Sequence, residues 1–167
     1  MKFKKGVIVW VFVIALSLIT VTFAGAKALY ETKPVPTEKR HTISADGQRV
    51  YISEFDKNQV LSVTSVTAEN SPETPFVFAR FEGGIGPDGL TVDTDGNLYV
   101  AHFQAGEIAV VDANGFKYGT IRLPKDAGTF ATNLAFQNGY LYVTESSKNE
   151  IWRIKVKKKG LPLYCSN

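Results

Sequence analysis

Three stretches of the chain carry the same order of apolar and polar positions. Each has a short alternating run, a turn containing glycine, and a second run in which a tyrosine stands between two aliphatic residues. These stretches are residues 42–54, 90–102 and 134–145. Alternation with a period of two is typical of strands buried on one face. Each stretch is therefore predicted to be a β-hairpin.

Further strands are predicted after each hairpin. A short polar loop leads to a third apolar run, at residues 59–63, 107–111 and 150–154. Two of the units have a fourth run, at residues 76–81 and 119–123. The unit recurs about every 45 residues, which matches the four-stranded blade of a β-propeller. We predict an all-β fold, a partial β-propeller of about three four-stranded blades, with no helix of ordinary length after the N-terminal leader.

The predicted hairpins turn at residues suited to tight turns. Asp46-Gly47, Asp95-Gly96 and Asn138-Gly139 lie between the first two strands of the three units. Asp-Gly and Asn-Gly pairs tolerate the positive φ angles that such turns require.

The N-terminus has the character of a targeting segment. A basic start, Met1–Lys5, is followed by residues 6–24, which contain no charged side chain. This order predicts an N-terminal hydrophobic helix that is either a signal peptide or a membrane anchor. Small residues allow cleavage after Ala26 or Ala28. We favour cleavage, and anchoring through residues 6–24 stays open.

The chain is accordingly divided into three parts. Residues 1–28 are a signal peptide or signal anchor, residues 29–41 are a proline-containing linker, and residues 42–167 are the partial propeller. The leader predicts a periplasmic or secreted protein, or one that is held at the membrane.

Net charge and cysteine content limit the binding partners and the covalent modifications that the sequence predicts. The formal net charge is +3, and several lysines gather at 155–159. A solvated strand end explains that cluster better than a phosphate or membrane contact, and nothing predicts nucleic-acid binding. Cys165 is the single cysteine, so neither an internal disulfide nor a lipoprotein is predicted.

The number of blades predicts an open assembly. A closed propeller has at least four blades, whereas about 125 residues at this period supply about three. The sheet edges left open predict self-association, because unpaired strands attract other chains.

Asp88 is the main candidate for chemistry. Residues 86–89, Gly-Pro-Asp-Gly, directly precede the first strand of the second unit. They are predicted to form a loop that delivers a carboxylate. The alternative is a simple turn, with proline presetting φ and Gly89 supplying a left-handed position.

The motifs resemble a known family. They are Phe81–Asp93, Gly96–Ala101, Thr132–Phe136, Leu141–Thr144 and Gly160–Tyr164. In this order they are similar to the family of senescence marker protein, gluconolactonase and luciferin-regenerating enzyme, over about residues 42–164. The resemblance implies a six-bladed propeller that binds a divalent ion, usually Ca²⁺, at its central channel and hydrolyses lactones or related esters.

The resemblance assigns Asp88 a double role, as a metal ligand and as the group that activates the attacking water. It also implies a glutamate ligand from a first blade and an asparagine from the blade before Asp88. The expected Ser-Asn-Gly aligns with Glu38-Lys39-Arg40, and a lysine cannot ligate a metal in its usual charged state. Asp88 is therefore the one matched ligand that remains, and calcium takes six to eight oxygens.

Other polar residues are weaker candidates. Residues 93–96 hint at an EF-hand, but the later oxygen positions and the closing glutamate are missing, so a hairpin turn is favoured. His102 has no serine or cysteine motif beside it, and a structural or solvated histidine is favoured over a channel residue.

Glu54 and Glu145 occupy equivalent positions and are expected to form surface or inter-strand pairs. The central tyrosines of the units, Tyr51, Tyr99 and Tyr142, are expected to pack in or between the blades.

Two function classes follow. The first is an exported, gluconolactonase-like, divalent-metal-dependent lactone or ester hydrolase, expected to be a truncated member with weak or no activity. The second is a non-catalytic propeller fragment that acts as a binding or assembly module. The first expects a small lactone or ester as its ligand, and the second expects a macromolecular partner at the open edges.

Overall fold

The computed structural model describes residues 40–65 and 74–162. The chain divides into a unit of residues 1–34 and a unit of residues 35–167, and every described residue belongs to the second unit. The predicted leader, its cleavage sites, most of the linker and Cys165 lie outside the described residues.

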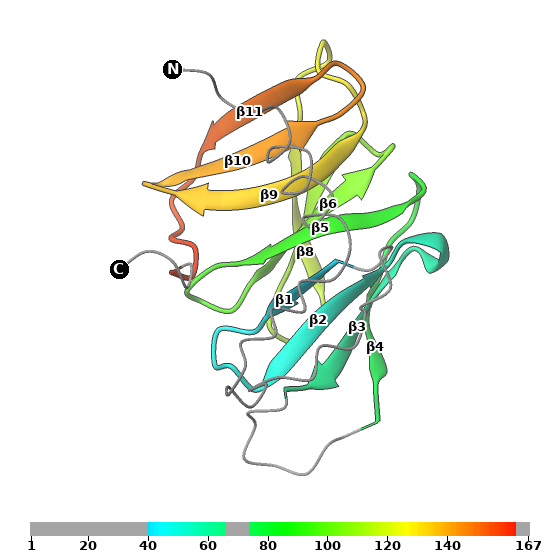
Figure 1. Cartoon of the computed structure of the whole chain (residues 1–167), viewed down its shortest axis with the longest axis vertical. Helices are drawn as coiled ribbons and strands as arrows, with labels where there is room; N and C mark the ends of the chain where they lie inside the picture. Colours follow the sequence, from blue (N-terminus) through cyan, green and yellow to red (C-terminus); the bar gives the residue numbers. More distant parts are fainter. Residues whose placement is uncertain (1–39, 66–73, 163–167) are drawn as a thin grey trace, which may run out of the picture. The chain divides into compact units, whose positions relative to one another are not determined.

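The described unit is built of short strands joined by tight connections (Figure 1). One 3₁₀ turn, η1 (Phe55–Lys57), joins the second and third strands. No helix in the described ranges is long and apolar enough to cross a membrane. The strands are β1 (His41–Ile43), β2 (Arg49–Glu54), β3 (Gln59–Thr64), β4 (Phe76–Arg80), β5 (Gly86–Val92), β6 (Leu98–Phe103), β7 (Glu107–Val111), β8 (Lys117–Arg122), β9 (Ala131–Gln137), β10 (Tyr140–Glu145) and β11 (Glu150–Lys155).

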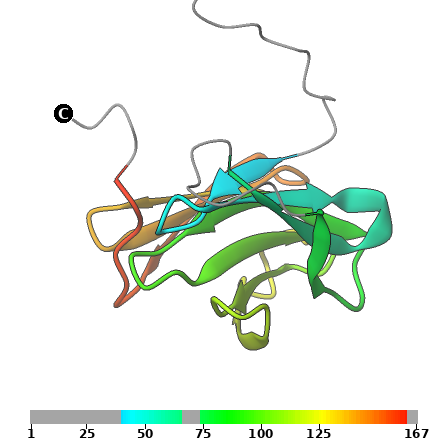
Figure 2. The same ribbon diagram turned by 90° about the horizontal axis from the view of Figure 1, so that it is seen from below.

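The strands form three antiparallel sheets in chain order. The first sheet is β1-β2-β3-β4, the middle sheet is β5-β6-β7-β8, and the last sheet is β9-β10-β11. The three predicted units are thereby confirmed as antiparallel sheets, and two of them have the predicted four strands. The last sheet has three strands among the described residues, one fewer than the predicted four-stranded blade. The first strands of the three sheets lie next to one another, since β5 contacts both β1 and β9. We call β1, β5 and β9 the inner strands. In Figure 2, β8 lies at the far side of the middle sheet from β5.

The hairpin turns follow the predicted chemistry. Gly47, Gly96 and Gly139 all have positive φ. In the middle sheet, the buried carboxylate of Asp93 accepts hydrogen bonds from the backbone N–H of Asp95, at 2.9 Å, and from Asn97. These bonds satisfy the carboxylate within the turn. The motif at 93–96 is a hairpin turn, as predicted.

A residue with left-handed backbone conformation precedes the third strand of every sheet. Asn58, Gly106 and Asn149 each take a left-handed backbone, with φ of 49°, 63° and 57°. Asparagine and glycine adopt this conformation at little cost. The repeat is therefore structural as well as sequential.

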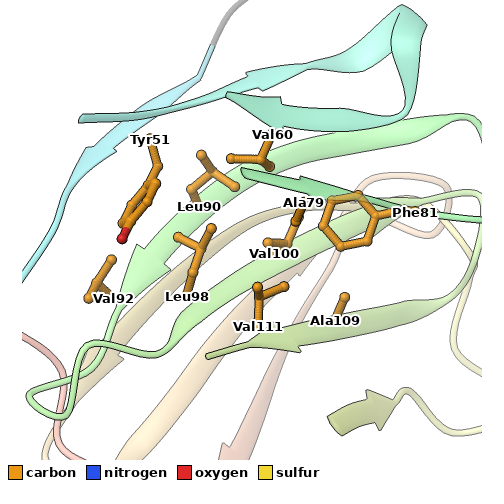
Figure 3. Packing of buried hydrophobic residues seen from close by; sticks show 10 residues of the cluster. All are labelled: Tyr51, Val60, Ala79, Phe81, Leu90, Val92, Leu98, Val100, Ala109 and Val111. Carbon is orange, nitrogen blue, oxygen red and sulfur yellow. The ribbon is translucent and has the colours of Figure 1, made fainter. Parts of the chain in front are cut away.

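Two apolar clusters hold the sheets together. One lies between the first and middle sheets and includes Tyr51, Val60, Leu90 and Val100 (Figure 3). The other lies between the middle and last sheets and includes Tyr99. Burial of such side chains is the main stabilising contribution to the fold.

Tyr142 differs from the other two central tyrosines. Its neighbours Leu141 and Val143 point into the second cluster, and successive side chains on a strand point to opposite faces. Tyr142 is half-buried on the other face of the last sheet. The prediction that all three tyrosines pack between blades is therefore wrong for Tyr142 within the described residues.

Among the described residues, the middle sheet is packed on both faces and each of the other two sheets on one. All five residues of β7 are buried, whereas half-buried and exposed residues alternate along β11. Exposed aliphatic side chains gather on the uncovered faces, where Ile43 and Ile151 are 44% and 71% exposed. The apolar surface left open thus includes sheet faces as well as the predicted edges.

Candidate functional site

The inner strands β5 and β9 depart from regular pairing at one shared place. On β5 the register shifts between Pro87, which is opposite His102, and Leu90, which is opposite Val100. Asp88 and Gly89 together stand opposite the single residue Ala101, so this bulge contains one extra residue. Bulges re-aim side chains and are common beside binding sites.

Strand β9 changes at the equivalent position. A shift places Ala131 opposite Glu145 and Asn133 opposite Thr144, with Thr132 as the extra residue. In the first sheet, Arg40 lies just ahead of β1 and is hydrogen-bonded to Ser53 of β2. These neighbouring segments supply a guanidinium, a carboxylate and a hydroxyl.

Asp88 lies in a strand, which corrects both predictions for this motif. Residues 86–92 form β5, and Gly89 is absent from the residues with positive φ. Neither a loop nor a simple turn describes Pro87-Asp88-Gly89. Because two consecutive residues occupy one pairing position, the strand can still present the carboxylate sideways.

Gly89 allows the close approach of the next inner strand. A Cβ atom at this position would lie 2.4 Å from Asn133 Oδ1 and 2.7 Å from the carbonyl oxygen of Thr132. Such distances leave no room for a side chain. Glycine is required here by contact, and it brings the two bulges side by side.

Asp88 is paired with Arg40. Arg40 Nε lies 3.0 Å from Asp88 Oδ1, and the two side chains are 53% and 17% exposed. Burial raises the pKa of the Asp88 carboxyl, and the positive charge of Arg40 opposes that rise. The Asp88 carboxylate is thus partly desolvated, and the Arg40 guanidinium is its counter-ion.

The backbone of Arg40 is fixed by the buried Ser53 of β2. The Ser53 backbone N–H donates to the Arg40 carbonyl at 2.9 Å. The Arg40 backbone N–H reaches Ser53 Oγ at 3.2 Å, and the Ser53 hydroxyl donates to the Arg40 carbonyl at 3.2 Å. The guanidinium is therefore delivered from a residue tied to the first sheet.

His102 is fully buried beside this site rather than in it. Its Nε2 lies 3.1 Å from Asn58 Oδ1, and its ring packs on Phe81. Its Nδ1 lies 3.8 Å from Glu107 Oε1 and makes no hydrogen bond with the described residues. Burial lowers the pKa of His102, although Glu107 opposes the change. This surrounding supports the predicted structural role.

Glu107 is itself buried and compensated. Lys117 Nζ lies 2.8 Å and Arg122 Nη2 3.4 Å from its carboxylate. Burial opposes ionisation of Glu107, but the two cations hold its pKa below the usual value.

The two other glutamates have local partners, as expected. Glu54 accepts from Gln59 and pairs with Lys57. The buried Glu145 accepts from the backbone N–H groups of Phe130 and Lys148 and from Ser147. Both therefore serve structure.

A cavity of about 630 Å³ lies elsewhere, on the last sheet. Its lining includes Phe136, Tyr142 and Leu161. The adjoining Gly160 pairs with Asp93 at the end of β5 far from Asp88. The cavity does not include the carboxylate of the bulge.

The described residues do not fit a calcium site at Asp88. Calcium needs six to eight oxygen ligands, several of them carboxylate or carbonyl. No group of three or more His, Cys, Asp or Glu side chains in 40–65 and 74–162 is arranged to hold a metal. The charged neighbour of Asp88 is instead the guanidinium of Arg40, which repels a cation. Glu38 and Lys39, aligned with other family positions, lie outside the described residues.

The sequence motifs do not single out Arg40. The repeat does not mark it either, because Arg40 stands two residues before Thr42, the partner of Tyr51, whereas Asp88 stands three residues before Thr91, the partner of Tyr99. Asn133 lies within the family motif Thr132–Phe136, and its proximity to Gly89 follows from the structure alone.

Comparison with known proteins finds relatives that match part of the chain. Lactonase drp35 of Staphylococcus aureus is 32% identical over 92 residues, which cover 52% of this chain and 28% of that protein. The lactonase drp35 of Staphylococcus epidermidis is 30% identical over 87 residues. The matched part thus spans between a quarter and a third of these relatives.

Solved structures share the fold. Luciferin-regenerating enzyme aligns with a TM-score of 0.63 at 23% identity, over 73% of this chain and 46% of the other. Regucalcin of Agrobacterium tumefaciens, described as a calcium-binding protein, aligns with a TM-score of 0.63 at 23% identity, over 75% and 48% of the two chains. These likenesses support the interpretation of the three sheets as part of a β-propeller.

The family pattern described as SMP-30/gluconolactonase/LRE-like region matches residues 41–147. This range includes all of the first and middle sheets and both bulges. The repeat, the sheet order and this match agree, and the chain belongs to the SMP-30/gluconolactonase/LRE-like family.

Proposed function

We propose that the protein binds a small lactone or ester beside Asp88 and hydrolyses it slowly. The observation that carries the proposal is the partly buried Asp88 carboxylate on the β5 bulge, next to the Arg40 guanidinium. The 32% identity to a lactonase over 92 residues supports the choice of substrate class. No step is assigned to a divalent ion, because the described residues do not fit one.

In this proposal Asp88 acts as a general base. It takes a proton from water while the water oxygen bonds to the carbonyl carbon of the ester. The tetrahedral intermediate then collapses, the bond to the ring or alkoxy oxygen breaks, and Asp88 returns its proton to that oxygen. The product is a hydroxy acid from a lactone, or an acid and an alcohol from an open ester. General-base catalysis contributes about 10²–10⁴-fold, which is modest for an enzyme.

Arg40 gives the site a donor for developing negative charge. Its N–H groups can stabilise the oxyanion of the intermediate. Burial raises the pKa of Asp88, which strengthens it as a base, and the same guanidinium limits that rise. Slow turnover is therefore expected.

The test is acid release from a small sugar lactone by the full chain. We expect a rate about 10²-fold above spontaneous hydrolysis, lost in Asp88→Asn. Asp95→Asn is the matched control, because Asp95 is an exposed turn carboxylate of the same sheet. A wild-type rate equal to the spontaneous one would falsify the proposal. So would an Asp88→Asn protein of unchanged activity.

A second candidate function is assembly through the uncovered sheet faces. It is favoured by the exposed aliphatic residues Ile43 and Val77 on the first sheet and Ile151 on the last, the latter 71% exposed. Monomeric proteins rarely expose large contiguous apolar patches. We expect the full chain to self-associate in light scattering and Ile151→Lys to reduce the association. A monomer at every concentration contradicts this candidate.

Export is part of the proposal. The basic start and the uncharged residues 6–24 support a periplasmic or secreted protein, or one anchored at the membrane. Fractionation of cells expressing the full chain distinguishes these from a cytoplasmic protein.

A further inference from the structure

We propose that Arg40 is the resident cation of the Asp88 site and excludes a divalent ion from it. The guanidinium takes the charge-balancing role that calcium would have at a lone carboxylate. Arg40 is thus the residue that determines which cation this site accepts. The inference stands on the ion pair and its anchoring, and it does not depend on lactone turnover.

Geometry is the first support. Arg40 Nε lies 3.0 Å from Asp88 Oδ1, while calcium binds oxygens at about 2.3–2.6 Å. An ion bound to this carboxylate would stand close to a fixed positive charge. With Asp88 only 17% exposed, water screens that repulsion incompletely.

Anchoring is the second support. The three hydrogen bonds between Arg40 and Ser53 hold the start of the side chain in place. Ser53 is buried within the first sheet. The backbone from which the guanidinium extends is therefore held in place beside Asp88.

The packing of the first strands is the third support. Arg40 lies just ahead of β1, Asp88 lies on β5, and β1 contacts β5, so the sheets themselves bring the opposite charges together. No third carboxylate of the described chain joins them in a metal-binding group. One positive and one negative charge leave the pair neutral, without the surplus negative charge that a divalent cation requires.

The first measurement is cation binding by the full wild-type chain. Calcium is titrated by calorimetry, and terbium luminescence serves as a second probe, up to about 1 mM, the weaker range of protein calcium sites. We expect no saturable binding that depends on Asp88 and no change in Tm. Saturable binding that is lost in Asp88→Asn overturns the proposal.

The second measurement is a double-mutant cycle on Tm. Arg40→Met keeps the apolar stem and removes the charge, and Asp88→Asn removes the partner charge. Each is expected to lower Tm by about 2–4 °C, and the double variant by no more than the larger single loss. Additive losses show that the pair is not coupled and overturn the proposal.

Lys158→Met is the matched control. Lys158 pairs with Asp95, but these side chains are 44% and 58% exposed. Exposed pairs contribute little, so we expect a Tm change below about 1 °C. If a site variant fails to fold, the wild-type cation titration still decides the outcome. A chain that binds no calcium yet fails to hydrolyse lactones refutes the proposed function and leaves this inference standing.

Discussion

Strands β7 and β11 are the third strands of successive units, yet they differ in burial at every position. Both begin with Glu-Ile, at Glu107-Ile108 and Glu150-Ile151. Ile108 is fully buried and Ile151 is 71% exposed. The middle sheet packs on both faces and the last sheet on one, so burial is decided by neighbours and not by the strand itself.

After the shared Glu-Ile, the sequences of the two strands differ in a way that matches their difference in burial. Strand β7 continues with Ala-Val-Val, an unbroken apolar run, and β11 continues with Trp-Arg-Ile-Lys, an alternating one. Continuous apolar strands are typical of sheets covered on both faces. The small Ala109 also stands where Trp152 is found on β11, which suits the more crowded sheet.

The largest expected effect comes from one substitution made in both strands. Ile108→Ala leaves a cavity in the second apolar cluster and should lower the free energy of unfolding by about 2–5 kcal/mol. Ile151→Ala, at the equivalent position, should change it by less than about 0.5 kcal/mol. Urea denaturation followed by circular dichroism measures both.

This pair of variants separates burial from strand propensity, since the residue change and strand position are the same. Equal losses would show that Ile151 is covered in the folded protein. They would then favour assembly through the outer face of the last sheet.

A smaller effect is expected from glycines of inner and outer strands. Gly89→Ala brings a methyl group against Asn133 and Thr132 and should cost about 1–3 kcal/mol. Gly119→Ala on β8 meets its nearest atom, Val110 Cβ, at 3.7 Å, an ordinary contact, and should be neutral or stabilise by up to about 1 kcal/mol. Thermal unfolding compares the two, and a neutral Gly89→Ala would refute the tight approach of the bulges.

The smallest effect concerns pH and the buried His102 of the middle sheet. Burial holds the pKa of His102 below its usual value of 6.5, so the unfolded chain binds more protons once the pH falls below about 7. Stability should therefore decrease from pH 7 towards pH 5, and His102→Gln should flatten this decrease. The matched control is His41→Gln, at an exposed residue of β1, which should leave the slope unchanged. If the slope persists in His102→Gln, another titrating group causes the pH dependence.

The repeating framework was accessible from the sequence because each signal was local. The alternation around Tyr51, Tyr99 and Tyr142, the glycine turns and the polar loops predicted β2, β6 and β10 and their neighbours. Strand ends differ by a few residues, as with β8, which begins at Lys117 rather than Gly119. A strand ends where its backbone groups no longer have hydrogen-bonding partners, and the types of side chain predict this end point poorly.

The site was predictable in position but not in form. The sequence draws attention to Asp88, yet Pro-Asp-Gly indicated a turn, because those residues favour turns in isolation. Tertiary pairing with β6 and the approach of β9 made the segment a bulged strand. Arg40 had no motif at all, since an ion pair between sheets depends on which strands become neighbours.

The bulges of β5 and β9, together with Arg40 ahead of β1, have a consequence for how such a protein can change. Their side chains stand on a scaffold whose apolar packing is made by other residues. Replacing three side chains, at Arg40, Asp88 and Thr132, would rewrite the charge of the site while the buried apolar clusters stay intact. Ligand preference in this architecture can therefore diverge in very few mutational steps, and a laboratory library confined to these three positions would sample it.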